Sequence, residues 1–258
     1  MPVDDAALRE RCIAGMAPAW AATAAGSGGS VWERDGITAA IVPKAPSRSV
    51  FNSVFYADPA ALLGSLDDLH AAYEEAGVWA WTVWVPDDDL GTGEALGREG
   101  HVLDAQPRYM GMNIDELIDP GPTEGFEFRE SDDRAEMARL NEIAYGYPPG
   151  DFEAVADAPL DGLKIWFADL DGEPACTLAI FPLNDDAEVL WVAAVPEARG
   201  RGVGGGLLAH ALRAAADDDL ETTTLQSTKL GAPVYTRLGY RDLGSAQMWE
   251  RRSPEPGG

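Results

Sequence analysis

The stretch VAAVPEARGRGVGGGLLAHAL at residues 192–212 determines how the rest of the chain is interpreted. It begins with apolar and β-branched residues typical of a strand, continues into a turn rich in Gly and Arg, and ends in a pattern typical of an amphipathic helix. Glycine occupies five of the seven positions 200–206, so the backbone can turn until successive N–H groups converge on one point. Together with the helix start and the charges of Arg199 and Arg201, these donors favour a bound pyrophosphate.

Two other phosphate-binding motifs fit this loop less well. Gly200, Gly202 and Gly205 fit the Gly-x-Gly-x-x-Gly fingerprint of dinucleotide-binding proteins. However, Glu221, near the expected distance for a ribose-binding acid, stands before a strand and not at its end. No Gly-Lys-Ser/Thr ends the loop, which argues against a P-loop. Antiparallel hairpins precede the loop where a Rossmann-type protein would have repeated strand–helix–strand units, so that class is also disfavoured.

A third pattern, Arg/Gln-x-x-Gly-x-Gly/Ala, is filled by Arg199, Gly202 and Gly204. Here the sequence resembles the GNAT superfamily of acyl-CoA N-acyltransferases. In that family this loop holds the pyrophosphate of coenzyme A, and the strand before it offers backbone groups to the pantetheine arm. A second stretch, LQSTKLGAPVYTRLGY at residues 225–240, resembles the family's sequence of strand, short helix, Tyr and Leu-Gly-aromatic.

The resemblance implies acetyl-CoA as co-substrate and assigns residues to it. The residues implied to hold the pantetheine arm, the diphosphate and one further part of the coenzyme are Val192, Ala193, Ala194, Arg199, Gly200, Arg201, Gly202, Val203, Gly204, Gly205 and Thr228. Thr228 departs from the family pattern, which often has Asn seven residues before the Tyr, so a shorter hydroxyl of Ser227 or Thr228 would replace it. The alternative for the loop is a strand-to-helix turn that binds nothing.

Acyl transfer to an amine needs a neutral nitrogen and a proton for the departing thiolate. By resemblance, Tyr235 matches the Tyr that protonates the thiolate, and Glu188 lies where family members often carry a Glu that acts as base through water. Each has a structural alternative: a packed Tyr at a helix start, and a solvated hairpin at residues 185–186 beside Glu188. Trp166 and Trp191 would line an acceptor groove or belong to the core.

The order of elements resembles that of a GNAT domain, which implies an α/β (α+β) chain with two GNAT-like domains, each a mixed, mostly antiparallel sheet flanked by helices. REGHVLDAQPRYMGM at residues 98–112 lines up with RLGYRDLGSAQMWER at residues 237–251, so we expect a degenerate N-terminal copy. The predicted division is a first domain at 1–118, a Pro/Gly-rich linker at 119–124, a catalytic domain at 125–252 and a tail at 253–258. The first copy has no Arg-x-x-Gly-x-Gly loop, so we expect it to bind no coenzyme A and to form a wall of the acceptor site.

Composition restricts the partners. The chain of 258 residues has 44 acidic and 19 basic residues, a formal net charge of −25, which argues against nucleic acid or anionic membranes and suits a cationic amine. No apolar stretch approaches the length of about 18 residues that spans a bilayer, and the acidic N-terminus does not resemble a signal peptide, so we expect a cytoplasmic protein. Cys12 and Cys176 are expected to be free, and three scattered histidines offer no metal-ligand spacing, so no metal is expected. Two fused copies favour a monomer over a homodimer.

These observations predict an N-acetyltransferase that moves an acetyl group from acetyl-CoA to a small-molecule primary amine by direct attack. The alternative is a GNAT-fold protein that binds acyl-CoA or regulates without turnover. The sequence identifies neither the acyl acceptor nor whether the acyl group is acetyl or longer.

Overall fold

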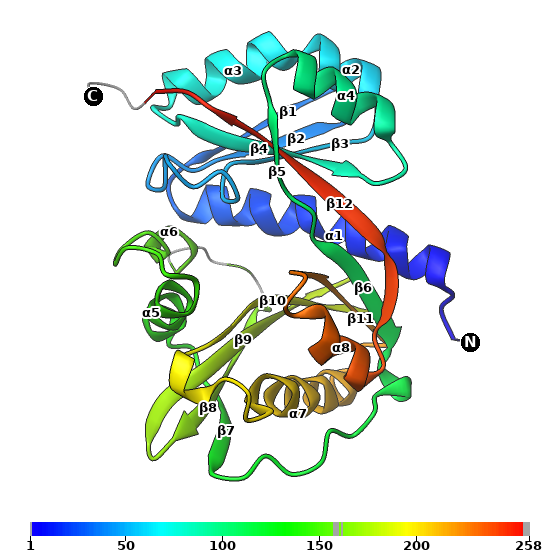
Figure 1. Ribbon diagram of the computed structural model, residues 1–258, viewed down its shortest axis with the longest axis vertical. Coiled ribbons are helices and arrows are strands. Elements are labelled where there is room, and N and C mark those ends of the chain that lie inside the picture. The colour runs from blue at the N-terminus through cyan, green and yellow to red at the C-terminus, as the bar shows by residue number, and fades with distance from the viewer. Residues whose placement is uncertain (1, 157–159, 161, 255–258) are drawn as a thin grey trace. The chain divides into compact units, whose positions relative to one another are not determined.

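The computed structural model describes residues 2–156, 160 and 162–254, and within them the chain forms two compact units (Figure 1). As far as they are described, unit 1 contains residues 2–15, 108–156, 160 and 162–244, and unit 2 contains residues 16–107 and 245–254. Each unit is a mostly antiparallel sheet with helices packed on it, which confirms the predicted fold class.

The sheet of unit 1 carries the Gly-rich stretch. Its strands, in spatial order, are β6 (Arg108–Asn113), β11 (Thr222–Ser227), β10 (Asp186–Ala194), β9 (Glu173–Leu183), β8 (Lys164–Leu170) and β7 (Phe126–Glu130). The pair β10–β11 is parallel, and the other pairs along this order are antiparallel. A parallel pair needs a helical crossover, and here the Gly-rich loop begins it.

Helical segments connect the strands of unit 1 and pack on its sheet. They are the first part of α1 (Asp5–Gly26), η1 (Ile114–Glu116), α5 (Arg134–Tyr145), α6 (Glu153–Ala156), η2 (Pro196–Ala198), α7 (Val203–Asp217) and α8 (Ala232–Leu238). Asp133 caps α5 by accepting a hydrogen bond from the amide of Glu136 at 3.0 Å, and α5 ends at Gly146 in the left-handed region. The crossover between β10 and β11 is made by α7.

The two faces of β10 have different chemistry. Ala187 and Val189 belong to the buried core that contains Leu207 and Leu208 of α7. Because side chains alternate along a strand, Asp186 and Glu188 point to the other face. The first part of α1 lies on that face, where a Cβ placed on Gly15 would be 2.9 Å from Oε2 of Glu188.

Unit 2 has a similar plan. The strands of its sheet are β1 (Ser30–Arg34), β2 (Ile37–Ile41), β3 (Ser53–Tyr56), β4 (Ala80–Pro86), the second part of β12 (Arg241–Arg252) and β5 (Val102–Ala105). Its helices are the second part of α1, α2 (Pro59–Gly64), α3 (Leu66–Glu75) and α4 (Leu90–Arg98). The helices α2 and α3 are separate because the chain leaves helical geometry at Ser65 (φ −110°, ψ 4°). β3 and β4 form a parallel pair, as β10 and β11 do in unit 1.

The boundary of the units differs from the predicted division at residues 119–124. The strand β6, from the first half of the sequence, pairs with β11 in unit 1 over its whole length. In return, β12 pairs with β4 in unit 2 from Ala246 onward. The predicted linker therefore lies inside unit 1, and residues 245–252 belong to unit 2. Residues 253–254 of the predicted tail follow β12, and residues 255–258 lie outside the described residues.

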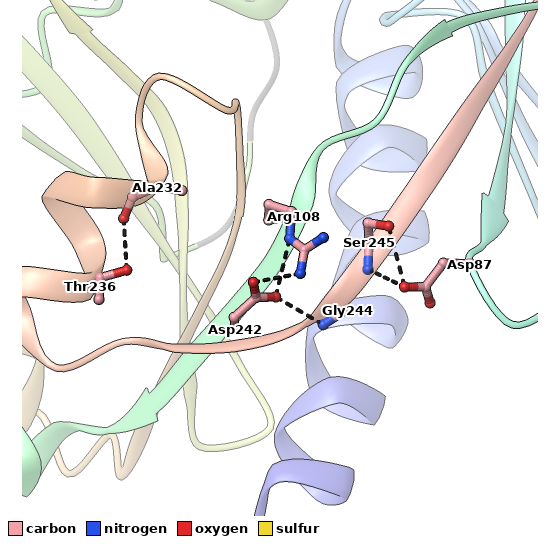
Figure 2. A network of polar contacts seen from close by, with 7 residues as sticks. All are labelled: Asp87, Arg108, Ala232, Thr236, Asp242, Gly244 and Ser245. Atoms are coloured by element: carbon pink, nitrogen blue, oxygen red, sulfur yellow. Dashed lines mark hydrogen bonds and ion pairs between the residues drawn. The ribbon is translucent and has the colours of Figure 1, made fainter.

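Polar contacts hold the exchanged strands on each side (Figure 2). In unit 1, the guanidinium of Arg108 on β6 forms a two-pronged ion pair with Asp242 at the start of β12, with Nε to Oδ1 at 3.1 Å. In unit 2, the carboxylate of Asp87 accepts hydrogen bonds from the amide and the hydroxyl of Ser245 at 2.8 and 3.2 Å. Local hydrophobic patterns do not encode such pairing between distant strands, which is why the predicted division missed it.

None of the helices in the described part of the chain combines the length and the apolar character needed to span a bilayer.

Candidate active site

The loop between β10 and α7 leaves the start of α7 open. Gly200 and Gly202 have φ of 74° and 79°, a region that favours glycine. A Cβ placed on Gly200, Gly202 or Gly204 would meet no atom within 4 Å. Gly202 is the N-cap of α7, and no side chain of the described residues caps it. The first N–H groups of a helix have no partner inside it, so those of Val203, Gly204 and Gly205 are available to an anion.

The two arginines of the loop are held by the protein. The guanidinium of Arg199 donates from Nε to the carbonyl of Ala194 at 3.1 Å and from Nη2 to the carbonyl of Ala144 at 2.7 Å. Its side chain thus joins the end of β10 to the end of α5. The guanidinium of Arg201 lies 4.6 Å from the ring centre of Phe126. Both residues are exposed, and their predicted contact with phosphate stays a prediction.

The strand before the loop is bulged and loses one neighbour. Trp191 has φ of 53°, and the pairing of β10 with β9 shifts register between Leu190 and Ala193. The parallel pairing of β10 with β11 extends only from Asp186 to Glu188 among the described residues. The predicted pantetheine residues 192–194 therefore follow a bulge, beyond the point where the two parallel strands part.

The backbone at these positions is partly engaged. The carbonyl of Val192 accepts a hydrogen bond from the hydroxyl of Tyr145 at 3.0 Å. Ala193 and Ala194 stay paired with β9. Pairing on one edge leaves the edge towards β11 available to a ligand chain.

Tyr235 lies on α8 and is 9% exposed. Its ring centre is 5.8 Å from that of Tyr240, and a Cβ placed on Gly231 would lie 3.2 Å from its Cε2. Within α8 the hydroxyl of Thr236 donates to the carbonyl of Ala232 at 3.0 Å (Figure 2). Burial raises the pKa of Tyr235, and neighbouring Tyr145 and Cys176 add to the rise. The phenol thus stays protonated at neutral pH and is available as a proton donor.

Ser227 and Thr228 shape the start of α8. The amide of Gly231 donates to the hydroxyl of Thr228 at 3.2 Å and to its carbonyl at 3.0 Å. The hydroxyl of Ser227 donates to the same carbonyl at 2.9 Å. Thr228 is exposed. The predicted coenzyme contact of either hydroxyl stays a prediction.

Glu188 is the last residue of β10 that pairs with β11, and it is 1% exposed. Neither carboxyl oxygen has a hydrogen-bond partner among the described residues. Burial, with a further contribution from Asp186, raises the pKa of Glu188 to about 8, and the nearby amide of Gln226 opposes part of this rise. The alternative of a solvated hairpin at residues 185–186 holds for Asp185, which is exposed, but is wrong for Asp186, which is buried like Glu188. A carboxyl group with this pKa is suited to act as a general base near neutral pH.

A polar cluster beside Glu188 was not predicted from the sequence. The carboxylate of Asp186 accepts hydrogen bonds from the hydroxyls of Thr222 and Thr224, both at 2.6 Å. Nη1 of Arg11 donates to the hydroxyl of Thr222 at 2.8 Å. The carboxylate of Asp186 is thus satisfied, while that of Glu188 is not. The alternating threonines of residues 222–224, which place two hydroxyls on one face, were the available signal.

The remaining candidates have structural roles. Trp166 is buried in the α7 core with its ring centre 5.2 Å from that of His210, so the core interpretation is correct for it. Trp191 sits in the bulge with its ring centre 6.2 Å from that of Phe152. Cys12 and Cys176 are free and buried, as predicted.

Comparison with known proteins agrees with this geometry. Residues 161–242, which include the loop, α7, β11 and α8, match the model of the acetyltransferase (GNAT) domain. No curated protein matches the chain. A solved GCN5-related N-acetyltransferase from Kribbella flavida is 19% identical, with 94% of this chain and 96% of that chain covered and a TM-score of 0.67.

Two further solved structures share the fold. A GCN5-related N-acetyltransferase from Sphaerobacter thermophilus is 18% identical, with 84% of this chain and 76% of that chain covered and a TM-score of 0.61. A tandem GNAT protein from the clavulanic acid biosynthesis pathway is 14% identical, with 84% of this chain and 78% of that chain covered and a TM-score of 0.51. Identities this low show a shared fold alone. Residues 161–242 thus match a GNAT domain, and the chain shares the fold of these solved proteins.

Proposed function

We propose that the protein transfers an acetyl group from acetyl-CoA to a primary amine by direct attack. The GNAT fold supports acyl transfer from an acyl-CoA. The observation that carries the proposal for this chain is the uncapped start of α7, which follows the bulged part of β10. An anion with several oxygens, such as a pyrophosphate, suits that helix start.

The protein's part in binding is positional. In this proposal the amides of residues 200–205 hold the diphosphate, and residues 192–194 align the pantetheine arm along β10. Arg199 holds the end of β10 and the end of α5 in place through its two carbonyl contacts. Acetyl-CoA supplies an activated thioester, and in this proposal its reactive end lies near Glu188 and Tyr235.

Proton movements are assigned to two buried groups. Glu188 takes a proton from the ammonium form of the acceptor, directly or through water, which leaves a neutral nitrogen. As the new C–N bond forms at the thioester carbonyl, the C–S bond breaks. Tyr235 then gives its hydroxyl proton to the departing thiolate. The second proton, which the attacking nitrogen loses as the amide forms, returns through water to the phenolate of Tyr235, and Glu188 releases its proton to solvent. The raised pKa of Glu188 supports its role as a base near neutral pH. The raised pKa of Tyr235 keeps the phenol protonated until the thiolate departs.

Binding and turnover are tested separately. Thermal unfolding with acetyl-CoA should show a clear rise in Tm, because a ligand that binds only the folded state stabilises it. Release of free thiol across a panel of amines should then identify turnover. No stabilisation at millimolar acetyl-CoA would contradict the proposal. Stabilisation without thiol release from any amine would leave a non-catalytic acyl-CoA-binding protein.

The role of Tyr235 has a matched control in the same core. Tyr235→Phe should lower kcat by about tenfold or more, since a positioned general acid contributes about 10²–10⁴-fold when proton transfer limits the rate. Tyr240→Phe removes a buried hydroxyl that lies 2.8 Å from the hydroxyl of Thr223. It should lower Tm without changing kcat. Equal turnover of Tyr235→Phe and the wild type would remove the acid assignment.

A further inference from the structure

We infer that a pocket under the first turns of α1 binds a small aliphatic ammonium ion through Glu188, and that this amine is the acyl acceptor. The pocket lies between α1 and the hairpin that joins β9 to β10, and its volume is about 240 Å³. Glu10, Ala14 and Asn184 on its lining are exposed, while Gly15 and Glu188 are buried. The pocket therefore leads from solvent to the carboxyl group of Glu188.

The charge in the pocket selects a cation. Its lining includes the carboxyl groups of Glu10, Asp186 and Glu188 and one guanidinium, that of Arg11. Arg11 donates to Thr222, and the oxygens of Asp186 accept from two threonine hydroxyls. The oxygens of Glu188 have no partner among the described residues, so they need a donor. An ammonium group brings three N–H donors and a positive charge.

The neighbours of Glu188 explain why no side chain of the described residues donates a hydrogen bond to its carboxyl oxygens. Gly15 lets α1 come so close that a Cβ there would lie 2.9 Å from Oε2 of Glu188. The amide of Gln226 on β11 makes long contacts of 3.4 and 3.5 Å with the carbonyl and sulfur of Cys12. No other charged side chain of α1 besides Glu10 and Arg11 lines the pocket among the described residues.

Size and lining limit the organic part of the ligand. Ala7, Ala14, Gly15 and Leu183 present apolar surface, which suits a short alkyl chain. A volume of about 240 Å³ lies below the range of about 300–1,000 Å³ typical of drug-sized ligands. Glu10 at the exposed end is placed for a second ammonium group. A short diamine should therefore bind more tightly than a monoamine of the same length.

The position of Glu188 connects this pocket to acyl transfer. Glu188 is where β10 and β11 stop pairing, and the proposed pantetheine residues 192–194 follow on the same strand. An ammonium group held by Glu188 thus loses its proton to the residue that binds it. This last step rests on the proposed function, whereas binding of the cation does not.

Calorimetric titration of the full chain without acetyl-CoA tests the binding site. The probes are 1,4-diaminobutane, 1-aminobutane and the uncharged 1-butanol, at pH 7 and pH 9. The alkylamines, with pKa near 10.4, are still protonated at pH 9, whereas Glu188 ionises with a pKa of about 8. We expect both amines to bind about tenfold more tightly at pH 9 than at pH 7, with no binding of 1-butanol.

Three variants separate this site from general surface charge. Glu188→Gln should weaken both amines at least tenfold and remove the pH dependence. Glu10→Gln should weaken the diamine about tenfold and leave the monoamine within twofold. Asp185→Asn, next to the pocket but outside its lining, should change neither. Asn suits the positive φ of 62° at this position, and an unchanged Tm for each variant verifies folding.

The outcomes distinguish the inference from the proposed function. Amine binding that follows the variants, without thiol release from acetyl-CoA, would confirm the cation site and refute acyl transfer to the bound amine. Thiol release with amines whose KM is the same in the wild type and in Glu10→Gln, with no calorimetric binding, would overturn the pocket and leave the transferase. Equal binding by wild type and Glu188→Gln would also overturn it.

Discussion

The two units treat the start of their crossover helix in opposite ways. In unit 1 the parallel pair β10–β11 is joined through α7, and in unit 2 the parallel pair β3–β4 is joined through α2 and α3. The helix α7 begins at Gly202, which has no capping side chain among the described residues. The helix α2 begins at Asp58, whose carboxylate accepts a hydrogen bond from the amide of Ala60 at 2.9 Å. Pro59, in the first turn of α2, has no N–H to offer.

The difference shows that a helix N-terminus is open to an anion when no side chain of the protein caps it. In unit 2 the negative charge that a helix N-terminus attracts is supplied by Asp58 itself. In unit 1 that charge has to come from a ligand, and 15 residues of α7 contribute to the helix dipole, against six of α2. We therefore propose that unit 2 binds no acyl-CoA, in line with the expectation of a degenerate copy.

Giving α7 the N-cap residue of α2 should remove the difference between the two helix starts. In Gly202→Asp a carboxylate would stand at the N-cap, repel phosphate and accept from the amides that phosphate needs. We expect the affinity for acetyl-CoA to fall about a thousandfold or more, because several hydrogen bonds to charged groups contribute about 1.5–3 kcal/mol each. Calorimetric titration with acetyl-CoA measures the loss.

The control variant also replaces a glycine that has a positive φ. Gly172 has φ of 85°, and a Cβ there would also meet no atom within 4 Å. Gly172→Asp should therefore lower stability by a similar amount, about 1–2 kcal/mol, and leave acetyl-CoA binding unchanged. An equal loss of affinity in both variants would show that backbone strain, and not the open helix start, controls binding.

The variant Glu188→Gln tests the step after coenzyme binding, because unit 1 also contains a buried acid beside an open pocket. We expect kcat to fall about 10²–10⁴-fold through loss of the general base. In the wild type, kcat/KM should rise as pH passes about 8, where Glu188 ionises, and this rise should vanish in the variant. The charged groups that face Glu188 are Asp186 on β10 and Glu10 and Arg11 on α1, so the apparent pKa belongs to this coupled set.

The same residue makes an independent prediction for stability. The pKa of Glu188 is raised above its ordinary value of 4.5, so the unfolded state loses this proton first as pH rises. The stabilisation that the protonated carboxyl provides is complete below pH 4.5 and is lost as pH rises to about 8. Glu188→Gln should thus raise the free energy of unfolding more at pH 8 than at pH 5. A pH-independent difference in urea titrations would contradict a buried, protonated carboxyl group.

The sequence identified the parts of this site that depend on neighbours along the chain. Glycines at residues 200–206 are visible as a loop because turn chemistry is local, and Tyr235 follows from a short helix with a matching pattern. Gly15 and Glu188 are close in the structure but far apart in the sequence, so no local pattern predicts their contact. The two carbonyl contacts of the Arg199 side chain also join distant residues, so the sequence did not predict them, and the contact of Arg199 with phosphate stays a prediction.

Unit 2 holds a buried ionisable residue of the opposite kind. His101 is 5% exposed, neither ring nitrogen has a partner among the described residues, and its ring centre lies 4.9 Å from that of Trp81. Burial, Arg251 on β12 and His70 on α3 lower the pKa of His101 from 6.5 to about 4, although the backbone carbonyl of Leu96 opposes part of this fall. A histidine that is held neutral by burial destabilises the folded state at low pH.

The sign follows from the lowered pKa. As pH falls below 6.5 the unfolded state takes up a proton that the folded state refuses, so stability is lost progressively down to about pH 4. His101→Phe should remove this loss, a gain of up to about 3 kcal/mol at pH 4.5 relative to the wild type. Urea titrations at pH 4.5 and pH 8 measure it, and the gain should be absent or reversed at pH 8. An equal gain at both pH values would show a packing effect instead.

The smallest effect concerns the cap that closes α2. Asp58→Ala should lower the stability of unit 2 by about 0.5–2 kcal/mol, the usual loss for an N-cap, because the amide of Ala60 loses its acceptor. It should not create acetyl-CoA binding, since α2 has no glycine loop before it and Pro59 removes one donor. Urea titration measures the first effect, and calorimetry of a chain that also carries Gly202→Asp measures the second. Binding in that double variant would mean that the open helix start is sufficient without the loop, and the contrast between the two units would then rest on a single side chain.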